Sequence, residues 1–283
     1  MKYIVPDYYS KFKCIADKCT HNCCIGWEID IDEFTYDYYI SCIDDFGKKL
    51  KEGINHKTCS FKTDCQGRCV FLNQKGLCDI IINMGENSLC DICNDHPRFR
   101  NFYSDREEMG LGLCCEEACR LILSRNKTEF ISTEDDCPEE PLTEEEKAFL
   151  INRDKIFKQI QNNNVPYLRK AELPGMTLGE TVKFYRQMER LSREWDVYLD
   201  KLKKPNEKYR LPENIVRQLG VYFLYRHGDE KFASHGVGFI ETLCGSLGEN
   251  PAFDEICEVC RMYSCEVEYS DINIESILHC IRQ

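Results

Sequence analysis

Ten cysteines stand at close, patterned spacings within the first 115 residues, and they constrain this chain more than any other feature. The most informative stretch runs from Cys90 to Arg100 and reads Cys-Asp-Ile-Cys-Asn-Asp-His-Pro-Arg-Phe-Arg. A Cys-x-x-Cys pair lets two thiolates reach one metal from a single tight turn, which zinc and iron–sulfur sites both need. A second dense group lies upstream, at Cys14, Cys19, Cys23 and Cys24. We interpret the two groups as halves of one metal-bearing domain.

The cellular compartment decides how so many cysteines are interpreted. The chain has 20 cysteines in 283 residues, and 14 of them lie in residues 1–119. Its first residues show no apolar signal segment, and no apolar run approaches the roughly 20 residues that span a bilayer. We therefore expect a cytoplasmic protein with no membrane partner. In that compartment, dense cysteines favour metal or redox chemistry over structural disulfides.

The kind of metal follows from the number and spacing of the cysteines. Zinc ribbons use matched Cys-x-x-Cys knuckles, whereas the N-terminal half has one such pair and two vicinal pairs, Cys23-Cys24 and Cys114-Cys115. Ten cysteines exceed one tetrahedral site and suit one or more iron–sulfur clusters, each held by about four thiolates. Zinc is the alternative. The three-cysteine radical motif is absent from the sequence, as is a Gly-x-Gly-x-x-Gly run after a strand.

The charge of the chain bears on its partners. The formal net charge is −12 at pH 7. A protein that follows nucleic-acid phosphates shows a basic face, so we expect no nucleic acid. An acidic surface is compatible with a basic partner, such as a lysine-bearing protein surface.

Hydrophobic patterning predicts a mainly α protein with two domains. We expect an irregular cysteine-rich metal-binding domain with short strands over 1–126, and a helical domain over 148–283. The segment 127–147 between them is predicted to be an acidic linker, because residues 128–147 hold nine acidic residues and one lysine.

Five local elements are expected in the N-terminal half. They are an extended entry or short strand over 1–13, a half-buried strand over 26–32, a helix over 33–51 capped by Asp32, a hairpin over 67–80 and a helix over 116–125. The helix over 33–51 would bury Phe34, Tyr38, Ile43, Phe46 and Leu50. Cys114 and Cys115 would stand at a helix N-terminus, where the dipole favours thiolates.

The C-terminal half has the apolar spacing of helices. We expect them from Thr143 onward, over 182–202, 215–227, 237–247 and 254–269, and over 272–281. Trp195 is predicted to be a core residue, and His227 and His235 surface residues. Cys257 and Cys260 form another Cys-x-x-Cys, which we interpret as two small buried residues, with a metal site as the alternative.

The cysteine pattern and the residues around it resemble a known family. The segments that carry the resemblance are Phe-Lys-Cys14 through Cys19, Cys23-Cys24-x-Gly-Trp-Glu-Ile-Asp-Ile-Asp, Gly-Arg-Cys69-x-Phe-Leu, Leu-Cys78-Asp-Ile, Cys90-x-x-Cys93-x-x-His-Pro-Arg-Phe-Arg-Asn-Phe and Gly-Leu-Gly-Leu-Cys114-Cys115-Glu-Glu. Residues 1–125 resemble flagellin lysine N-methylases of the FliB type. The cysteine pattern alone is similar to a wider, YkgJ-like group of zinc- or iron-chelating proteins.

This resemblance implies a cofactor, an activity and a ligand set. It implies an iron–sulfur protein with a [4Fe–4S] cluster that transfers methyl groups from S-adenosylmethionine to lysine side chains of flagellin or another lysine-bearing protein. The metal ligands that it implies are Cys14, Cys19, Cys23, Cys24, Cys69, Cys78, Cys90, Cys93, Cys114 and Cys115. The alternative is a metal-chelating or electron-transfer protein, with iron–sulfur or zinc, that has no methylase activity.

The residues for the methyl donor and for catalysis are less defined by the sequence. His96, Arg98 and Arg100 are the candidate cofactor-binding residues, because an arginine fork can hold the carboxylate of S-adenosylmethionine. Charge balance beside the thiolates is the other explanation for the two arginines. A polar methyl transfer needs a group that takes the proton of the lysine, whereas a reductive one needs an electron donor. The candidate proton acceptors are Glu28, Asp30, Asp32 and Asp95, and no catalytic residue is assigned.

Overall fold

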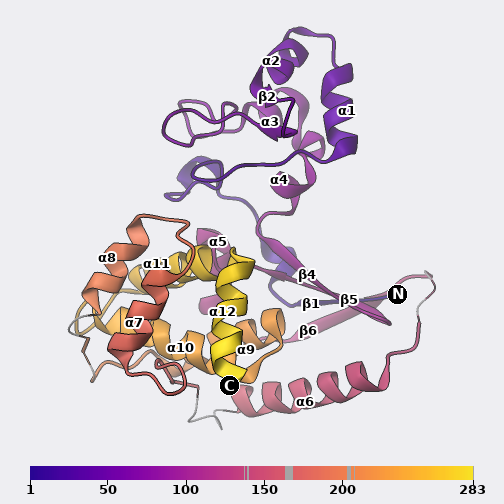
Figure 1. Ribbon diagram of the computed structural model, residues 1–283. Helices are drawn as coiled ribbons and strands as arrows, with labels where there is room; N and C mark the ends of the chain where they lie inside the picture. The colour runs from indigo at the N-terminus through magenta and orange to yellow at the C-terminus, as the bar shows by residue number, and fades with distance from the viewer. Residues whose placement is uncertain (137, 139, 163–167, 203–204, 207, 283) are drawn as a thin grey trace. The chain divides into compact units, whose positions relative to one another are not determined.

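The computed structural model describes residues 1–282 except 137, 139, 163–167, 203–204 and 207 (Figure 1). Cys137 and one acidic residue of the predicted linker therefore lie outside the described residues. The chain forms two compact units. Lys13–Pro97 is called here the cysteine-rich unit, and Met1–Phe12 together with Arg98–Gln283 is called the helical unit. Each unit is described by itself.

The two units divide the chain at positions that differ from the predicted linker at 127–147. The reason is β1 (Lys2–Pro6), which pairs with β5 (Arg106–Leu111) and β6 (Phe130–Glu134). This pairing joins the N-terminal residues to the later part of the chain. One part of the predicted linker is therefore a strand of the sheet in the helical unit.

Helices dominate the structure, as the sequence predicted. The described residues are about 52% helical, with twelve α-helices and a small mixed sheet. Within the part of the chain that the structure describes, no helix combines the length and the apolar composition that crossing a membrane requires.

The sheet of the helical unit has the strand order β4-β5-β1-β6, with β4 spanning Arg98–Tyr103 (Figure 1). β1 runs parallel to β5 and antiparallel to β6, and it confirms the strand predicted near the N-terminus. In the antiparallel β4–β5 pair, Phe99 stands opposite Gly110. A Cβ atom at Gly110 would approach the Phe99 ring to 2.3 Å, so only glycine lets this ring lie flat across the strand.

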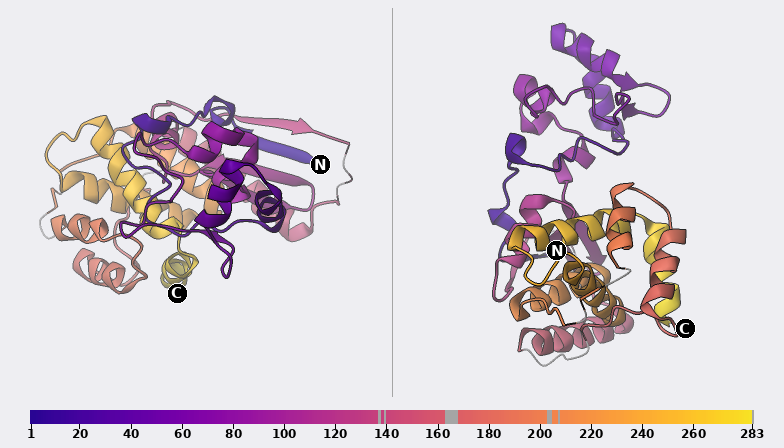
Figure 2. Two further views of the ribbon diagram at one scale, coloured as in Figure 1. Left: turned by 90° about the horizontal axis from the view of Figure 1, so that it is seen from above. Right: turned by 90° about the vertical axis from the view of Figure 1, so that its left-hand side faces the viewer.

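The described part of the helical unit also contains eight α-helices and one π-helical segment. They are α5 (Glu116–Leu123), α6 (Glu144–Gln161), α7 (Leu178–Gln187), α8 (Glu194–Lys201), α9 (Glu213–His227), α10 (Glu230–Gly245), α11 (Phe253–Tyr263), the π-helical Ser264–Glu268 and α12 (Asp271–Arg282). α9 packs along α10, and both are drawn in orange tones in the two views of Figure 2. α5 packs against α11. Trp195 is fully buried in their shared core, which confirms its predicted place.

The cysteine-rich unit is built from short elements. They are α1 (Glu33–Ser41), α2 (Asp45–Gly53), β2 (Ile54–Asn55), β3 (Ser60–Phe61), α3 (Asp79–Met84) and α4 (Asp91–Asp95). A small core of its own contains Tyr39, Leu50 and Phe71, together with Cys69 and Cys90. Two of the predicted metal ligands are therefore fixed by packing as well as by the loops that carry them.

The helix predicted over 33–51 is two helices, α1 and α2. Asp32 caps α1 as predicted, since its side chain accepts a hydrogen bond from the Thr35 amide at 2.8 Å. The chain then breaks after Ser41, and Asp44 caps α2 through the Gly47 amide at 2.6 Å. A Cβ atom at position 47 would lie 2.5 Å from the Cys42 carbonyl oxygen, so the tight break depends on glycine.

This break makes the predicted apolar side of the helix wrong in part. Phe34 is 86% exposed and Ile43 is 90% exposed, whereas Leu50 is buried. Tyr39, which was not among the residues predicted to be buried, lies in the core instead. The predicted apolar side assumed one continuous helix. Because the chain forms two helices, the residues assigned to that side point in different directions.

Two other predictions for the helical part are corrected. The run over 182–202 is two helices, α7 and α8, because α7 ends at Gln187 and α8 begins at Glu194. His227 and His235 are not surface residues. His227 donates to the Glu268 carboxylate at 2.6 Å, and His235 contacts the Tyr185 hydroxyl at 2.8 Å, both inside the unit.

Candidate metal centre

Six of the predicted ligand cysteines in the cysteine-rich unit influence one another electrostatically. They are Cys23, Cys24, Cys69, Cys78, Cys90 and Cys93. The hydrogen bond with Cys23 and burial raise the pKa of Cys24 most, and negative charge on Cys78 or Cys69 raises it further. The hydrogen bond with Cys90 and burial likewise raise the pKa of Cys93 most, and charge on Cys24 or Cys23 adds to this. Such effects need short separations, because a charge loses its influence quickly with distance. Cysteines up to 70 positions apart in the sequence therefore lie near one another. We call them the six linked thiols.

Backbone contacts between loops bring these thiols together. The Cys69 amide donates to the Cys24 carbonyl at 2.8 Å. This hydrogen bond links the cysteines of segment 14–24 to the loop that contains Cys69. Cys78 forms an isolated bridge with Leu72 across the turn that was predicted as a hairpin. Cys78 then precedes α3, and Cys90 precedes α4, which contains Cys93. Each thiol therefore stands at a turn or at the first residues of a helix, where the backbone direction is fixed locally.

Two pairs of neighbouring thiols share hydrogen bonds. The bond between Cys23 and Cys24 lowers the pKa of Cys23 and raises that of Cys24. The bond between Cys90 and Cys93 lowers the pKa of Cys90 and raises that of Cys93. One thiol of each pair therefore loses its proton more easily than an isolated thiol, while the second ionisation is opposed by the first. A bound cation removes that opposition, because it stabilises both thiolates.

Cys69 and Cys78 have a different environment. Burial raises the pKa of Cys69 to about 11, and the amides of Phe71 and Leu72 act in the opposite direction. Burial likewise raises the pKa of Cys78, against the amides of Ile81 and Ile80. Backbone N–H groups directed at a sulfur favour its thiolate form and help to orient it as a ligand.

The sulfurs of Cys14 and Cys19 have local contacts. Cys14 is exposed, and its sulfur accepts from the Ala16 amide at 3.4 Å. The Cys19 thiol donates to the His21 carbonyl at 3.2 Å. Both residues belong to the cysteine-rich unit. Their assignment as metal ligands stays a prediction.

Cys114 and Cys115 belong to the helical unit. Cys115 is the N-cap residue of α5, which confirms its predicted place at a helix N-terminus. The buried Cys114 thiol donates to the Tyr269 hydroxyl at 2.9 Å, and burial raises its pKa well above the usual value. Their role as metal ligands also stays a prediction.

In the positions that the side chains take, the described residues contain no group of three or more His, Cys, Asp or Glu that could hold a metal ion. The donors themselves are thiols, which select zinc, copper(I) and iron–sulfur clusters over hard cations. The chemistry of the six linked thiols thus fits the cofactor that the sequence implies.

The candidate cofactor-binding residues have separate surroundings. The His96 ring lies 6.3 Å from the Trp27 ring, centre to centre, in the cysteine-rich unit. In the helical unit, the Arg98 guanidinium lies over the rings of Phe12 and Tyr9, at 5.5 and 5.8 Å. Arg100 forms an ion pair with Glu107 at 2.9 Å. The aromatic rings hold Arg98 in a defined direction through cation–π contact.

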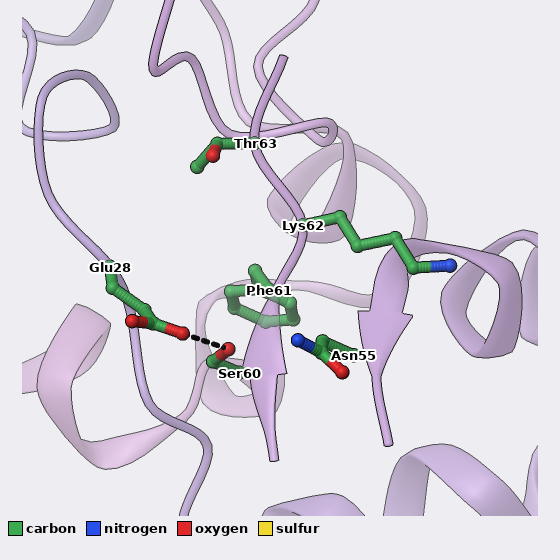
Figure 3. A pocket seen from close by; sticks show the side chains of 6 residues that line it. All are labelled: Glu28, Asn55, Ser60, Phe61, Lys62 and Thr63. Carbon is green, nitrogen blue, oxygen red and sulfur yellow. Dashed lines mark hydrogen bonds between the residues drawn. The ribbon is translucent and has the colours of Figure 1, made fainter. Parts of the chain in front are cut away.

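A polar hollow of about 370 Å³ lies in the cysteine-rich unit (Figure 3). It is lined by Glu28, Asn55, Ser60, Phe61, Lys62 and Thr63. The Ser60 hydroxyl donates to the Glu28 carboxylate at 2.8 Å, which holds that carboxylate at the rim. The Lys62 amine points away from Glu28 and donates to the Glu52 carbonyl at 2.7 Å. The carboxylate and hydroxyl oxygens that line this hollow can accept hydrogen bonds from an amine.

Of the other candidate proton acceptors, Asp32 has a structural role. One carboxylate oxygen caps α1, and the other accepts from the Asp91 amide at 3.0 Å. Partial burial opposes ionisation, but the amides of Asp91 and Thr35 outweigh it and lower the pKa of Asp32. A carboxylate stabilised in this way is a weak base. Asp32 therefore fixes the start of α1 next to the Cys90–Cys93 turn.

Comparisons of this chain with protein-family models, with curated proteins and with solved structures found no match.

Proposed function

We propose that this chain is an iron–sulfur protein that transfers methyl groups from S-adenosylmethionine to lysine side chains of flagellin. The observation that supports the proposal most directly is the set of six linked thiols in the cysteine-rich unit. A bound cation stabilises neighbouring thiolates that otherwise raise one another's pKa values, so such a set of thiols suits a metal. The methyl transfer and the flagellin substrate rest on the family resemblance of residues 1–125.

The residues proposed to hold a [4Fe–4S] cluster come from the six linked thiols, with Cys90 and Cys93 as the central pair. When bound, such a cluster supplies electron transfer, or a Lewis-acidic iron where a ligand position is left for substrate. The chain itself contributes backbone amides that hydrogen-bond to the Cys69 and Cys78 sulfurs. Cys90 is fully buried, so the surrounding core holds it in place. We place the protein in the cytoplasm, where thiols stay reduced and available to metal.

The hollow at Glu28 is the proposed place for the target lysine. A lysine amine accepts a methyl group only after losing its proton, and a nearby carboxylate or tyrosine can take that proton. Glu28 is held by Ser60, and Phe61 provides an apolar wall for the methylene chain of a lysine.

The alternative is a metal-chelating or electron-transfer protein without methylase activity. It uses the same thiols, so the same observation supports it. The two functions differ in one property, which is the binding of S-adenosylmethionine. Calorimetric titration of the anaerobically purified protein with S-adenosylmethionine therefore separates them.

The catalytic proposal predicts methylated flagellin, detected by mass spectrometry after coexpression with the intact protein. Cys90→Ser should abolish methylation, because it removes a central ligand. Cys42→Ser is the matched control in the same unit. The Cys42 thiol donates to the nearby Tyr38 carbonyl at 3.4 Å and is not one of the six linked thiols, so the substitution should leave methylation unchanged. Glu28→Gln should lower the rate at least tenfold with iron content unchanged, in keeping with the usual contribution of a proton acceptor.

A second control tests the specific role of Glu28. Glu86 is an exposed acid of the same unit that does not line the hollow, so Glu86→Gln should keep the wild-type rate. If flagellin gains no methyl groups with the wild-type protein and S-adenosylmethionine does not bind, the methylase proposal fails and the metal-binding alternative stands.

A further inference from the structure

The outward side of α1 carries apolar side chains that remain in contact with solvent. Phe34 is 86% exposed and Tyr38 is 43% exposed, and because they are four residues apart in the helix they share one face. The Cys42 thiol donates to the Tyr38 carbonyl at 3.4 Å, which holds the end of the helix against its last turn. Ile43 follows directly and is 90% exposed. We call Phe34, Tyr38 and Ile43 the exposed α1 face.

α1 has apolar residues on both its inner and its outer side. On the inner side Thr35 and Tyr39 are buried, and the Tyr39 hydroxyl donates to the Ser88 carbonyl at 2.5 Å. The outer side of a surface helix is ordinarily polar, because only the inner side is covered by the core. Single exposed apolar residues are common on proteins, whereas a contiguous group of them marks a surface that another molecule covers.

The charges around this face indicate what kind of molecule covers it. Four exposed acidic residues lie on the helix or directly after it, namely Glu33, Asp37, Asp44 and Asp45. Residues 19–47 contain seven acidic residues and no lysine or arginine. Within the described part of the chain, Glu33 and Asp37 form no ion pair. An acidic rim around apolar side chains favours a cationic partner and opposes an anionic one.

We propose that the exposed α1 face binds a segment of a partner protein that presents lysine or arginine side chains beside apolar ones. The apolar side chains of the segment cover the exposed α1 face, and its cations pair with Glu33 and Asp37. A second copy of this chain is a poor occupant, because a symmetric contact brings two identical acidic rims together. Nucleic acid and anionic lipid are repelled for the same electrostatic reason.

This inference rests on the surface of α1 and needs no methyl transfer. Where the proposed function holds, the segment belongs to the protein whose lysine is methylated, and the exposed α1 face gives that protein a docking contact in addition to the target lysine. Binding of the segment and methylation of flagellin are therefore measured separately.

The probe is a fluorescein-labelled synthetic helical peptide with leucine on one side and lysine on the other. Its binding to the full-length, anaerobically purified protein is followed by fluorescence anisotropy. Wild type should bind the peptide, and added salt should weaken binding, because the ion pairs are exposed. Phe34→Ser and Ile43→Ser should each weaken binding about tenfold, as expected when an apolar anchor is lost from an interface.

Two controls separate the exposed α1 face from general stickiness. Ile151→Ser is the matched apolar control, because Ile151 is 72% exposed on α6 and should keep wild-type binding. A peptide with glutamate in place of lysine tests the charge and should not bind. Phe34 and Ile43 are both highly exposed, so their substitution should preserve the fold, which circular dichroism and iron content check.

The proposal is overturned if the folded Phe34→Ser and Ile43→Ser proteins bind the lysine peptide as tightly as wild type, or if the glutamate peptide binds equally well. It is also overturned if wild type sediments as a dimer and Phe34→Ser as a monomer, because a second copy then covers the face. Peptide binding without flagellin methylation contradicts the proposed function alone, whereas methylation without peptide binding contradicts this inference alone.

Discussion

His235 is held without its proton inside the helical unit. Its side chain is buried, and Nε2 lies 2.8 Å from the Tyr185 hydroxyl. Burial lowers the pKa of His235 from its usual 6.5 to about 4. The unfolded chain therefore binds a proton between pH 6.5 and pH 4 that the folded chain does not bind. This histidine adds to stability above that window, and its contribution is lost as the pH falls through it.

This difference predicts a measurable pH dependence. Between pH 7 and pH 5, His235 should reduce the free energy of unfolding by about 2 kcal/mol, as the shift from 6.5 to about 4 implies. His235→Gln should remove that part of the dependence, because glutamine has no proton to gain. Urea unfolding at the two pH values measures it, followed through Trp195 in a Trp27→Phe background, since the chain has two tryptophans.

The matched control for His235→Gln is His56→Gln. His56 is exposed in the cysteine-rich unit, so this substitution should leave the pH dependence as it is in wild type. An equal pH dependence in wild type and His235→Gln would contradict the account of a neutral buried histidine.

The sequence misplaced this histidine and His227 for a physical reason. A Gly-Asp-Glu turn follows His227, and turns usually lie at the surface. The Glu268 carboxylate, 41 positions away, accepts hydrogen bonds from His227 and Tyr222 inside the core. Nothing near either histidine in the sequence marks such a distant partner.

At the scale of elements, Asp32 joins two parts of the cysteine-rich unit. Its two carboxylate oxygens accept from the Thr35 amide of α1 and from the Asp91 amide that begins α4. Asp44 makes a similar cap for α2, with the Gly47 amide as its partner. Asp32 therefore connects two helices, whereas Asp44 caps only its own.

Removing these caps should destabilise the unit by different amounts. A lost N-cap costs about 1 kcal/mol, and a second amide left unpaired adds about 1 kcal/mol or more. Asp32→Ala should therefore lower the free energy of unfolding about twice as much as Asp44→Ala, measured by urea denaturation. Equal losses would show that the Asp91 contact adds nothing.

The local parts of these elements were predictable, and the tertiary parts were not. The caps at Asp32 and Thr143 follow from side chains that bond to amides three residues on, so the sequence contains both partners. The break between α1 and α2 depends instead on the close approach of Gly47 to Cys42. The length of the helix was therefore wrong, although its start was right.

At the scale of the whole molecule, the cysteines divide between the two units. The sequence singled out ten cysteines as metal ligands, and the six linked thiols are among them. It did not connect Cys119 with Cys257, because these residues are 138 positions apart and only the packing of α5 against α11 brings the Cys119 thiol to the Cys257 carbonyl. The boundaries between the two units could not be predicted from local sequence patterns either, because β1 pairs with strands more than 100 residues later in the chain.

The central claim is that the cysteine-rich unit carries an iron–sulfur cluster, and the most direct measurement is the iron and acid-labile sulfide content of anaerobically purified protein. The account predicts a brown protein with iron and sulfide in near-equal amounts, visible absorption that bleaches on reduction, and loss of both elements in Cys90→Ser or Cys93→Ser but not in Cys42→Ser. Stoichiometric zinc in the cysteine-rich unit without any sulfide would contradict it.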